Sequence, residues 1–193
     1  MSATQPCQFL NPEAYLDWEE KQPEKYEFFK GEAYAMVGAR DAHVTVAGNV
    51  FALLKAHLRG TPCRAYISDM KLQVEAADAF FYPDVFVTCD PRDRLSERYK
   101  SYPVLIVEVL SESTAAFDRG AKFAAYRKLE SFKEYLLIDP DAFTAELFRR
   151  NAEGLWVLYP LEGEGELELA SVGLRITWDA VFEDVLPAAR TQG

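Results

Sequence analysis

Apolar positions along the chain follow a helical spacing in two segments of the first third. Asn11 suits a helix cap and Pro12 suits the first position of a helix, so we expect a helix over residues 12–22. A longer apolar stripe predicts a second helix over residues 42–59, with Asp41 as its cap. Both segments carry polar residues between the apolar ones, which is typical of helices packed on one face.

Strand-like segments dominate the remainder. Aromatic residues at 26–29 and 32–37 flank Lys30-Gly31 and predict a hairpin with a tight turn. Further apolar or alternating runs predict strands over residues 65–74, 83–89, 104–110, 134–138, 143–149, 156–159 and 166–170. Helices are expected over residues 118–129 and 178–182. This order predicts an α/β or α+β fold, with a mixed sheet, helices on its faces and hairpins added at both ends.

The strand expected over residues 104–110 carries a carboxylate, Glu108, in the middle of an apolar run. An unpaired ionised carboxylate in an apolar interior costs several kcal/mol or more. Glu108 is therefore expected to be protonated, to pair with a buried Lys or Arg, or to hold a cation. Its role bears directly on the function of the chain.

Composition narrows the class of protein. The 193 residues, 49% of them hydrophobic, suit a single domain spanning 1–193. No signal peptide or membrane-spanning run is found, so a cytoplasmic location is expected. Cys7, Cys63 and Cys89 are scattered and are expected to be reduced.

The net charge of −10 argues against a protein that binds duplex DNA mainly through its overall electrostatic attraction. The basic residues that precede the strand with Glu108 are expected to form a solvated surface; they are Arg92, Arg94, Arg98 and Lys100.

Two carboxylates on consecutive strands carry the candidate chemistry. Asp84 follows a proline at a strand start, and Glu108 lies on the next strand. Mg²⁺ takes one or two carboxylates plus waters and phosphate oxygens, so the pair suits such a cation. Asp118, Lys122 and Tyr126 recur at four-residue spacing and share one helix face. Lys122 also lies early in its helix, where the dipole favours an anion.

These residues resemble the Uma2 family, also described as DUF820, within the PD-(D/E)XK nuclease superfamily. The resemblance covers roughly residues 26–186 and rests on Tyr26-Glu27 with Gly31-Glu32, the helix opening at His43, Tyr82-Pro83-Asp84-Val85, residues 103–114, Asp118 with Lys122 and Tyr126, and residues 133–140. It implies a restriction-endonuclease-like fold and a cytoplasmic endonuclease that hydrolyses DNA with Mg²⁺ or Mn²⁺. A homodimer is also expected, because cutting two strands usually takes two sites.

The resemblance assigns roles to individual residues. Asp84 and Glu108 would bind the metal ion, and Lys122 would stabilise developing negative charge or orient the nucleophile. Glu27 would supply a third acid, with Tyr126 as a further supporting residue. His43 is open to two interpretations, as a general base or substrate contact, or as a capping or packing residue.

One departure from the superfamily pattern leaves an alternative open. The pattern places a lysine two residues beyond the strand acid, where this chain has Leu110, so Lys122 must reach back from the helix. The second hypothesis is therefore a non-catalytic module of the same fold that acts in binding or assembly. Taken singly, Asp84 also suits a turn and Lys122 a solvated helix surface. Serine hydrolase and phosphate-loop motifs are absent from the sequence.

Overall fold

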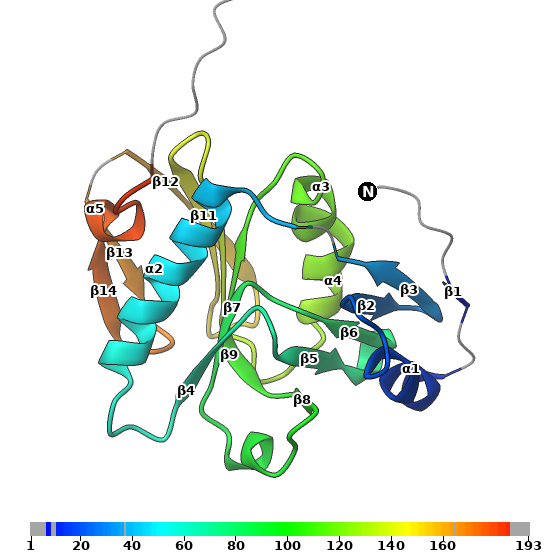
Figure 1. The fold of residues 1–193 in the computed structure, drawn as a ribbon. Coiled ribbons are helices and arrows are strands. Elements are labelled where there is room, and N and C mark those ends of the chain that lie inside the picture. Colours follow the sequence, from blue (N-terminus) through cyan, green and yellow to red (C-terminus); the bar gives the residue numbers. More distant parts are fainter. Residues whose placement is uncertain (1–6, 9–10, 37, 164, 186–193) are drawn as a thin grey trace, which may run out of the picture.

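A mixed six-stranded sheet carries the strand that contains Glu108 (Figure 1). The computed structural model describes residues 7–8, 11–36, 38–163 and 165–185. The strand order is β12-β11-β10-β9-β7-β4; β9 and β10 run parallel, and the other neighbours run antiparallel. The strands are β4 (Arg64–Ile67), β7 (Val85–Thr88), β9 (Pro103–Val109), β10 (Glu134–Asp139), β11 (Thr144–Arg150) and β12 (Trp156–Glu162).

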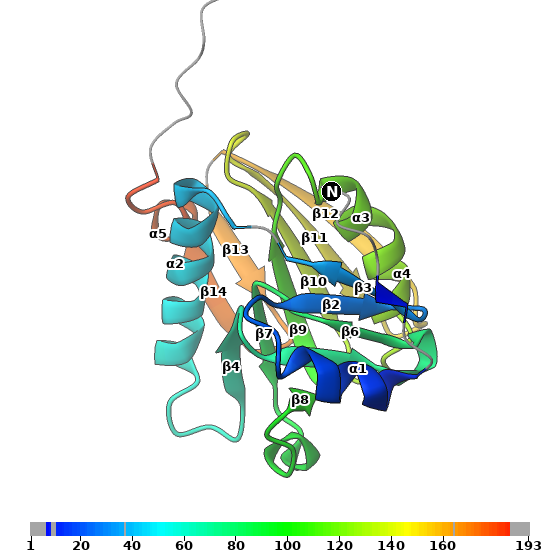
Figure 2. The same ribbon diagram turned by 45° about the vertical axis from the view of Figure 1, so that its right-hand side comes forward.

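A second sheet is built mainly from the N-terminal half, in the order β1-β3-β2-β6-β5-β8. Its strands are β1 (Cys7–Gln8), β2 (Tyr26–Phe29), β3 (Glu32–Ala35), β5 (Lys71–Val74), β6 (Ala79–Phe81) and β8 (Tyr99–Lys100). Figure 2 shows β2 and β3 in front of the larger sheet. A separate hairpin near the C-terminus pairs β13 (Glu166–Leu169) with β14 (Leu174–Thr177).

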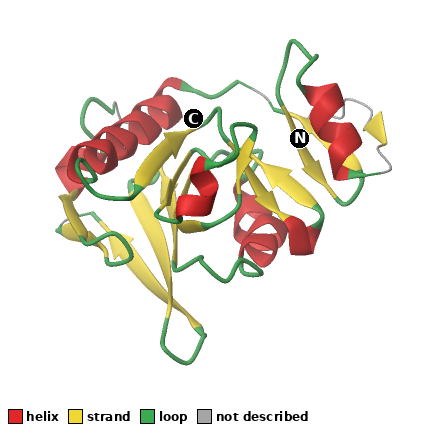
Figure 3. Cartoon of the chain, turned by 90° about the horizontal axis from the view of Figure 1, so that it is seen from below, coloured by secondary structure: helices red, strands yellow, loops and turns green. Residues whose placement is uncertain are grey.

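Helices cover both faces of the larger sheet (Figure 3). α2 packs on one face together with the β13–β14 hairpin and α5, and the α3–α4 segment lies on the other. The α-helices are α1 (Pro12–Glu19), α2 (Asp41–His57), α3 (Ala115–Phe117), α4 (Phe123–Tyr126) and α5 (Trp178–Val181). A π-helical turn, η3 (Asp118–Lys122), joins α3 to α4, and 3-10 turns form η1 (Glu75–Ala77) and η2 (Pro91–Arg94).

β9 is buried on both faces, which explains its apolar run. Val107 and Val109 pack in the core on the α2 side, whereas Ile106 and Leu110 pack on the α3–α4 side. Successive strand side chains point to opposite faces, so Glu108 points to the α3–α4 side with Ile106 and Leu110. The sheet thus directs the Glu108 carboxylate toward the helix that carries Lys122.

The predicted mixed fold is confirmed, and local signals account for several of its elements. Asn11 accepts a hydrogen bond from the Ala14 N–H at 2.8 Å and caps α1. Lys30 and Gly31 have positive φ values of 51° and 84°, as a two-residue hairpin turn requires. The closing helix α5 lies close to its expected position.

Other expectations need correction. The single strand expected over residues 65–74 is two strands in different sheets, because the chain turns at Ser68, which has a φ of 40°. Asp41 lies in the first turn of α2 rather than capping it, and the preceding residue, Arg40, makes no side-chain cap. Strands β1, β6, β8 and β14 were not expected. Position 37, placed at the end of the hairpin, lies outside the described residues.

The cysteine prediction was wrong for two of the three residues, because Cys63 and Cys89 form a disulfide. Cys63 directly precedes β4 and Cys89 directly follows β7. These strands pair antiparallel with Arg64 opposite Thr88, so the next position in register brings the two cysteines together. A separation of 26 residues along the chain conceals this proximity.

Three consecutive aromatic residues before Asp84 belong to the core. Phe80, Phe81 and Tyr82 are all buried. Phe81 contacts the Tyr126 ring edge-on, which ties the smaller sheet to α4. In the part of the chain that the structure describes, none of the helices is both long and apolar enough to span a bilayer.

Candidate active site

Asp84 and Glu108 meet where β7 begins beside β9. Val85 pairs with Val107, so Asp84 lies opposite Glu108 in the same antiparallel register. The Asp84 backbone N–H donates to Glu108 Oε2 at 3.3 Å. The two carboxylates predicted from consecutive strands are therefore neighbours.

The Asp84 carboxylate is held by two further groups. Its Oδ2 accepts the backbone N–H of Val109 at 2.7 Å, and its Oδ1 lies 2.9 Å from His43 Nε2. The first turn of α2 places His43 at this position. The side chains of Asp84 and His43 keep 19% and 17% of their surface exposed, so this part of the site is reachable from solvent. The structure thus favours a site contact for His43 over a helix cap.

Lys122 lies at the centre of an acidic cluster. Its Nζ is 2.9 Å from Glu108 Oε1, 3.1 Å from Glu27 Oε1 and 3.6 Å from Asp118 Oδ1. The Tyr126 hydroxyl donates to the same Glu108 oxygen at 2.9 Å. Lys122 and Glu108 are almost fully buried, so the ammonium interacts with the carboxylate in surroundings that exclude most water.

The π-helical turn η3 supplies two members of this cluster, Asp118 and Lys122. Single π-helical turns within α-helices are uncommon and frequently occur at functional sites. The Tyr135 hydroxyl donates to the Asp118 carbonyl at 3.1 Å and anchors this turn to β10. The helix predicted over residues 118–129 therefore begins three residues earlier, at Ala115, and is irregular where it approaches β9.

Glu27 enters the cluster from the smaller sheet. It lies on β2, and its Oε1 accepts the Tyr82 backbone N–H at 3.0 Å. The Tyr82 hydroxyl donates to Glu19 at 2.7 Å, and Glu19 pairs with Lys71 at 2.6 Å. A buried polar network thus fixes the segment immediately before Asp84.

Burial and charge set the protonation of the cluster. Burial raises the pKa of Glu108 well above its usual range, against the lowering effect of the Lys122 ammonium. Burial by itself lowers the pKa of Lys122, but the nearby acids, Glu108 first and Glu27 next, outweigh it and raise that pKa well above its ordinary value. Burial also raises the pKa of Tyr126. Lys122 is therefore a cation at neutral pH, and the Tyr126 phenol is neutral.

The structure brings together all six residues expected at the site: Glu27, His43, Asp84, Glu108, Lys122 and Tyr126. Of the three options for Glu108, the pair with a buried lysine is present, because Glu108 Oε1 lies 2.9 Å from Lys122 Nζ. A cation held by Glu108 stays a prediction. Lys122 reaches back from the helix, while Leu110 is buried in the core. Asp118 was not expected in the site, although its four-residue spacing from Lys122 signalled a shared face.

The basic residues near β8 are occupied by intramolecular contacts. Arg92 pairs with Asp90, Arg98 pairs with Asp17 and Glu20, and the Lys100 ammonium donates to the Asp93 carbonyl at 2.8 Å. The expectation that this loop forms a solvated surface is therefore too simple, because Lys100 is buried.

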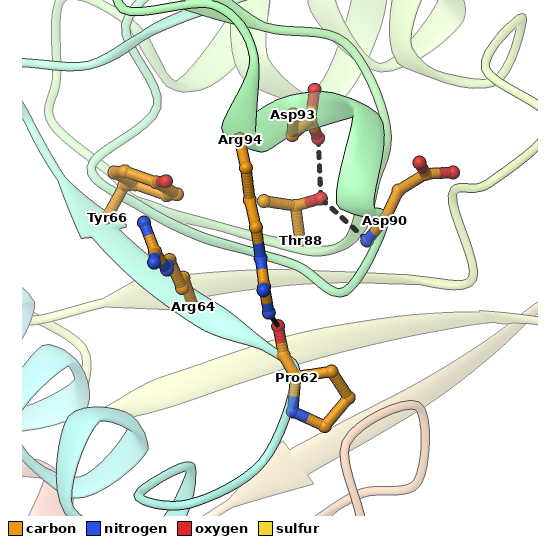
Figure 4. Close-up of a pocket in the computed structure, with 7 residues that line it drawn as sticks. All are labelled: Pro62, Arg64, Tyr66, Thr88, Asp90, Asp93 and Arg94. Carbon is orange, nitrogen blue, oxygen red and sulfur yellow. Dashed lines mark hydrogen bonds between the residues drawn. The ribbon is translucent and has the colours of Figure 1, made fainter.

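Arg94 belongs to a small hollow at the far end of β4 and β7 from Asp84 (Figure 4). It donates to the Pro62 carbonyl at 2.9 Å. Thr88 and Asp93 hydrogen-bond to each other across the same hollow (Figure 4). Its position separates it from the acidic cluster.

The donor set bears on the expected metal ion. Among the described residues, no group of three or more His, Cys, Asp and Glu side chains is arranged to hold a metal. Mg²⁺ needs only one or two protein carboxylates, with waters and substrate oxygens completing its shell. Asp84 and Glu108 are adjacent oxygen donors, and Glu108 Oε2 makes a single long contact. The pair therefore fits a hard divalent cation, whereas a site built wholly from protein ligands is not present in the described chain.

Comparisons with known proteins identify the family of the chain. Residues 12–181 match the Uma2 family, described as "Putative restriction endonuclease". The chain is 40% identical over 181 residues to uncharacterized protein slr1290 of Synechocystis, covering 94% of this chain and 95% of that protein. Uncharacterized protein sll1609 of the same organism is 35% identical over 164 residues, covering 83% and 93% of the two chains.

A crystal structure has a similar fold. It is described as a "putative nuclease belonging to DUF820" from Anabaena variabilis, with a TM-score of 0.69, 18% identity and coverage of 89% of this chain and 98% of that one. At this identity the similarity concerns the fold. The family match extends over most of the chain, from α1 to α5. The chain therefore belongs to the Uma2 family.

Proposed function

We propose that the protein is a divalent-metal-dependent endonuclease that hydrolyses phosphodiester bonds of DNA. The observation that carries the proposal is the convergence of Asp84, Glu108 and Lys122, with the ammonium 2.9 Å from Glu108. Paired carboxylates beside a buried ammonium suit the binding and stabilisation of a phosphate group. The family description and the nuclease title of the structural relative support the same class of reaction.

Asp84 and Glu108 would hold Mg²⁺ or Mn²⁺. When bound, such an ion lowers the pKa of a water molecule and stabilises charge on phosphate oxygens. The Val109 N–H and His43 fix the Asp84 carboxylate, so its orientation is set before substrate arrives. This preorganisation lowers the cost of assembling the site.

Lys122 would stabilise the negative charge that develops on the phosphate. Its high pKa keeps the ammonium charged, and Glu27 and Asp118 hold it beside Glu108. A cation in low-dielectric surroundings interacts more strongly with developing charge than the same cation in water. Tyr126 orients Glu108 through its hydroxyl.

A cleft of about 470 Å³ lies at the same end of the larger sheet as Asp84, although the six site residues do not line it. It lies at the carboxyl ends of the parallel strands β9 and β10, and Leu110 and Ser111 at its edge directly follow β9. Ligands of sheet proteins commonly bind at this end of parallel strands.

The test is a cleavage assay on linear, supercoiled and single-stranded DNA with Mg²⁺ or Mn²⁺. Wild type is compared with Asp84→Asn, Glu108→Gln and Lys122→Ala, and the exposed Glu153→Gln serves as a matched control. Each site variant should lose cleavage, with the lysine variant slower by roughly 10²–10³-fold. Equal cleavage by wild type and Asp84→Asn would overturn the proposal.

A non-catalytic binding module is the second candidate. It is favoured by the pairing of Lys122 with three carboxylates, which leaves the ammonium less available to a phosphate. Calorimetric titration with Mn²⁺ separates the two candidates. Heat of binding that Asp84→Asn abolishes favours the nuclease, and no heat with wild type favours the module.

A further inference from the structure

Tyr34 lies beside the candidate site on the neighbouring strand. In the β2–β3 hairpin Glu27 pairs directly with Tyr34. Directly opposed residues of an antiparallel pair point to the same face, with their Cβ atoms about 4.5–5.5 Å apart. Glu27 itself contacts Lys122 at 3.1 Å. The Tyr34 side chain therefore projects from β3 beside Glu27, and Glu27 contacts the Lys122 ammonium.

The Tyr34 ring is available to a ligand. The residue is 37% exposed, and its hydroxyl donates to Glu32 on the same strand. That hydrogen bond is the main cause that raises the pKa of Tyr34 to about 12, so the phenol is neutral. Between described residues, none of the ring contacts involves Tyr34. The hydroxyl is thus occupied, and part of the Tyr34 side chain is exposed to solvent.

Two further apolar side chains are exposed on segments that adjoin site residues in the chain. Met36 lies two residues after Tyr34, on the same side of the chain, and is 36% exposed. Val44 follows His43 in the first turn of α2 and is 58% exposed. Exposed apolar residues thus lie close in the chain to Tyr34 and to His43.

Two arginines on segments that carry site residues are already paired. Arg40, just before α2, pairs with Asp141, and Arg119, next to Asp118, pairs with Glu146 at 2.8 Å. The cleft at the carboxyl ends of β9 and β10 contains three acids, Glu112, Asp139 and Asp141. Duplex DNA presents two phosphate backbones and is held mainly by free cations. Because these arginines are paired, attraction of a phosphate backbone is weak for a duplex and a single strand alike, and stacking on Tyr34 would strengthen binding only of a strand with unstacked bases.

Resting on the proposed nuclease function, we propose that the site acts on single-stranded DNA and that Tyr34 stacks on the base next to the phosphate held at Lys122. Aromatic side chains bind single strands in this way because every base has a stacking face, whereas bases within a duplex are covered by their neighbours. Tyr34 is thereby a substrate-selecting residue.

Binding is measured without metal, by fluorescence anisotropy of a short labelled single strand and of the matching duplex in EDTA. Wild type should bind the single strand more tightly. Tyr34→Ala should weaken that binding at least about fivefold, while Tyr34→Phe stays within about twofold because the ring is retained. Tyr159→Ala is the matched control, because Tyr159 is 42% exposed on the distant strand β12.

Two results would overturn the inference: tighter binding of the duplex, or equal single-strand binding by wild type and Tyr34→Ala. Cleavage with Mg²⁺ in the same preparations keeps the two proposals apart. If wild type and Tyr34→Ala cleave equally well, the inference is wrong and the proposed nuclease function is retained. If single-strand binding depends on Tyr34 but no cleavage is seen, the proposed nuclease function is wrong and the proposed recognition of single strands is retained.

Discussion

Lys122 Nζ lies 2.9 Å from Glu108 Oε1, although the two residues belong to different elements and are both almost fully buried. The π-helical turn carries the lysine, and the alternation of β9 turns the glutamate toward it. Burying two charges is costly, and the pair offsets this cost only as long as both partners are present.

Removing the lysine alone should therefore destabilise the fold. We expect Lys122→Met to lower the free energy of unfolding by roughly 3–5 kcal/mol, because Glu108 loses its countercharge in the interior. The double variant Lys122→Met/Glu108→Gln should recover part of that loss. Urea denaturation in EDTA measures both values.

Arg175→Met serves as the control for this pair of variants, because Arg175 and its partner Glu168 are both exposed. It should leave stability nearly unchanged. A Lys122→Met protein as stable as wild type would show that the buried pair contributes nothing.

Removing the Tyr126 hydroxyl should also be costly. Tyr126→Phe keeps the ring in the core but takes a donor from the buried Glu108 carboxylate. Hydrogen bonds to charged groups contribute about 1.5–3 kcal/mol, and we expect a loss of that size. Thermal and urea denaturation are compared with Tyr159→Phe, an exposed tyrosine on β12. Equal losses in the two variants would contradict the prediction.

Metal binding should depend on pH. Protons and Mn²⁺ compete for Glu108, and burial raises the pKa of this carboxyl well above its usual range. Affinity should therefore fall as the pH is lowered through that raised pKa and reach its full value above it. Calorimetry at a series of pH values should show proton release that accompanies binding. Glu108→Gln should weaken Mn²⁺ binding and reduce its dependence on pH, and wild-type affinity that stays constant as the pH is lowered argues against the prediction.

Reducing the disulfide should lower stability. Cys63 and Cys89 close a loop of 26 residues, and such a crosslink contributes about 2–4 kcal/mol. Urea denaturation with and without a phosphine reductant measures the difference, and the Cys63→Ala/Cys89→Ala variant should match the reduced protein. Thiol titration after unfolding should find two more thiols in the reduced sample. Equal thiol counts would show that the bond does not form.

The acidic pair was predictable because each residue had a local signal. Glu108 was conspicuous in an apolar strand, and Asp84 followed a proline at a strand start. The spacing of Lys122 and Tyr126 gave their common helix face. The spacing did not show whether the Lys122 side chain reaches Glu108, because that depends on how the helix packs over β9.

Other features depend on contacts between distant parts of the chain. Residues on both sides of Ser68 carry strand patterns, and only their partners in two different sheets reveal the break. The disulfide follows from the β4–β7 register rather than from cysteine spacing. The spacing of Asp118 indicated the helix face on which it lies but not the residue that it contacts. Tertiary pairing decides each of these features, and local preference does not encode it.

The π-helical turn has an evolutionary consequence. An α-helix advances about 100° per residue, so deleting one residue from η3 (Asp118–Lys122) would swing everything after the deletion around the helix axis. The sheet and both carboxylates would remain in place while the lysine turned away from them. Such a deletion in a related protein would therefore separate the ammonium from the carboxylates, and it would also turn Phe123 and Tyr126 out of the core.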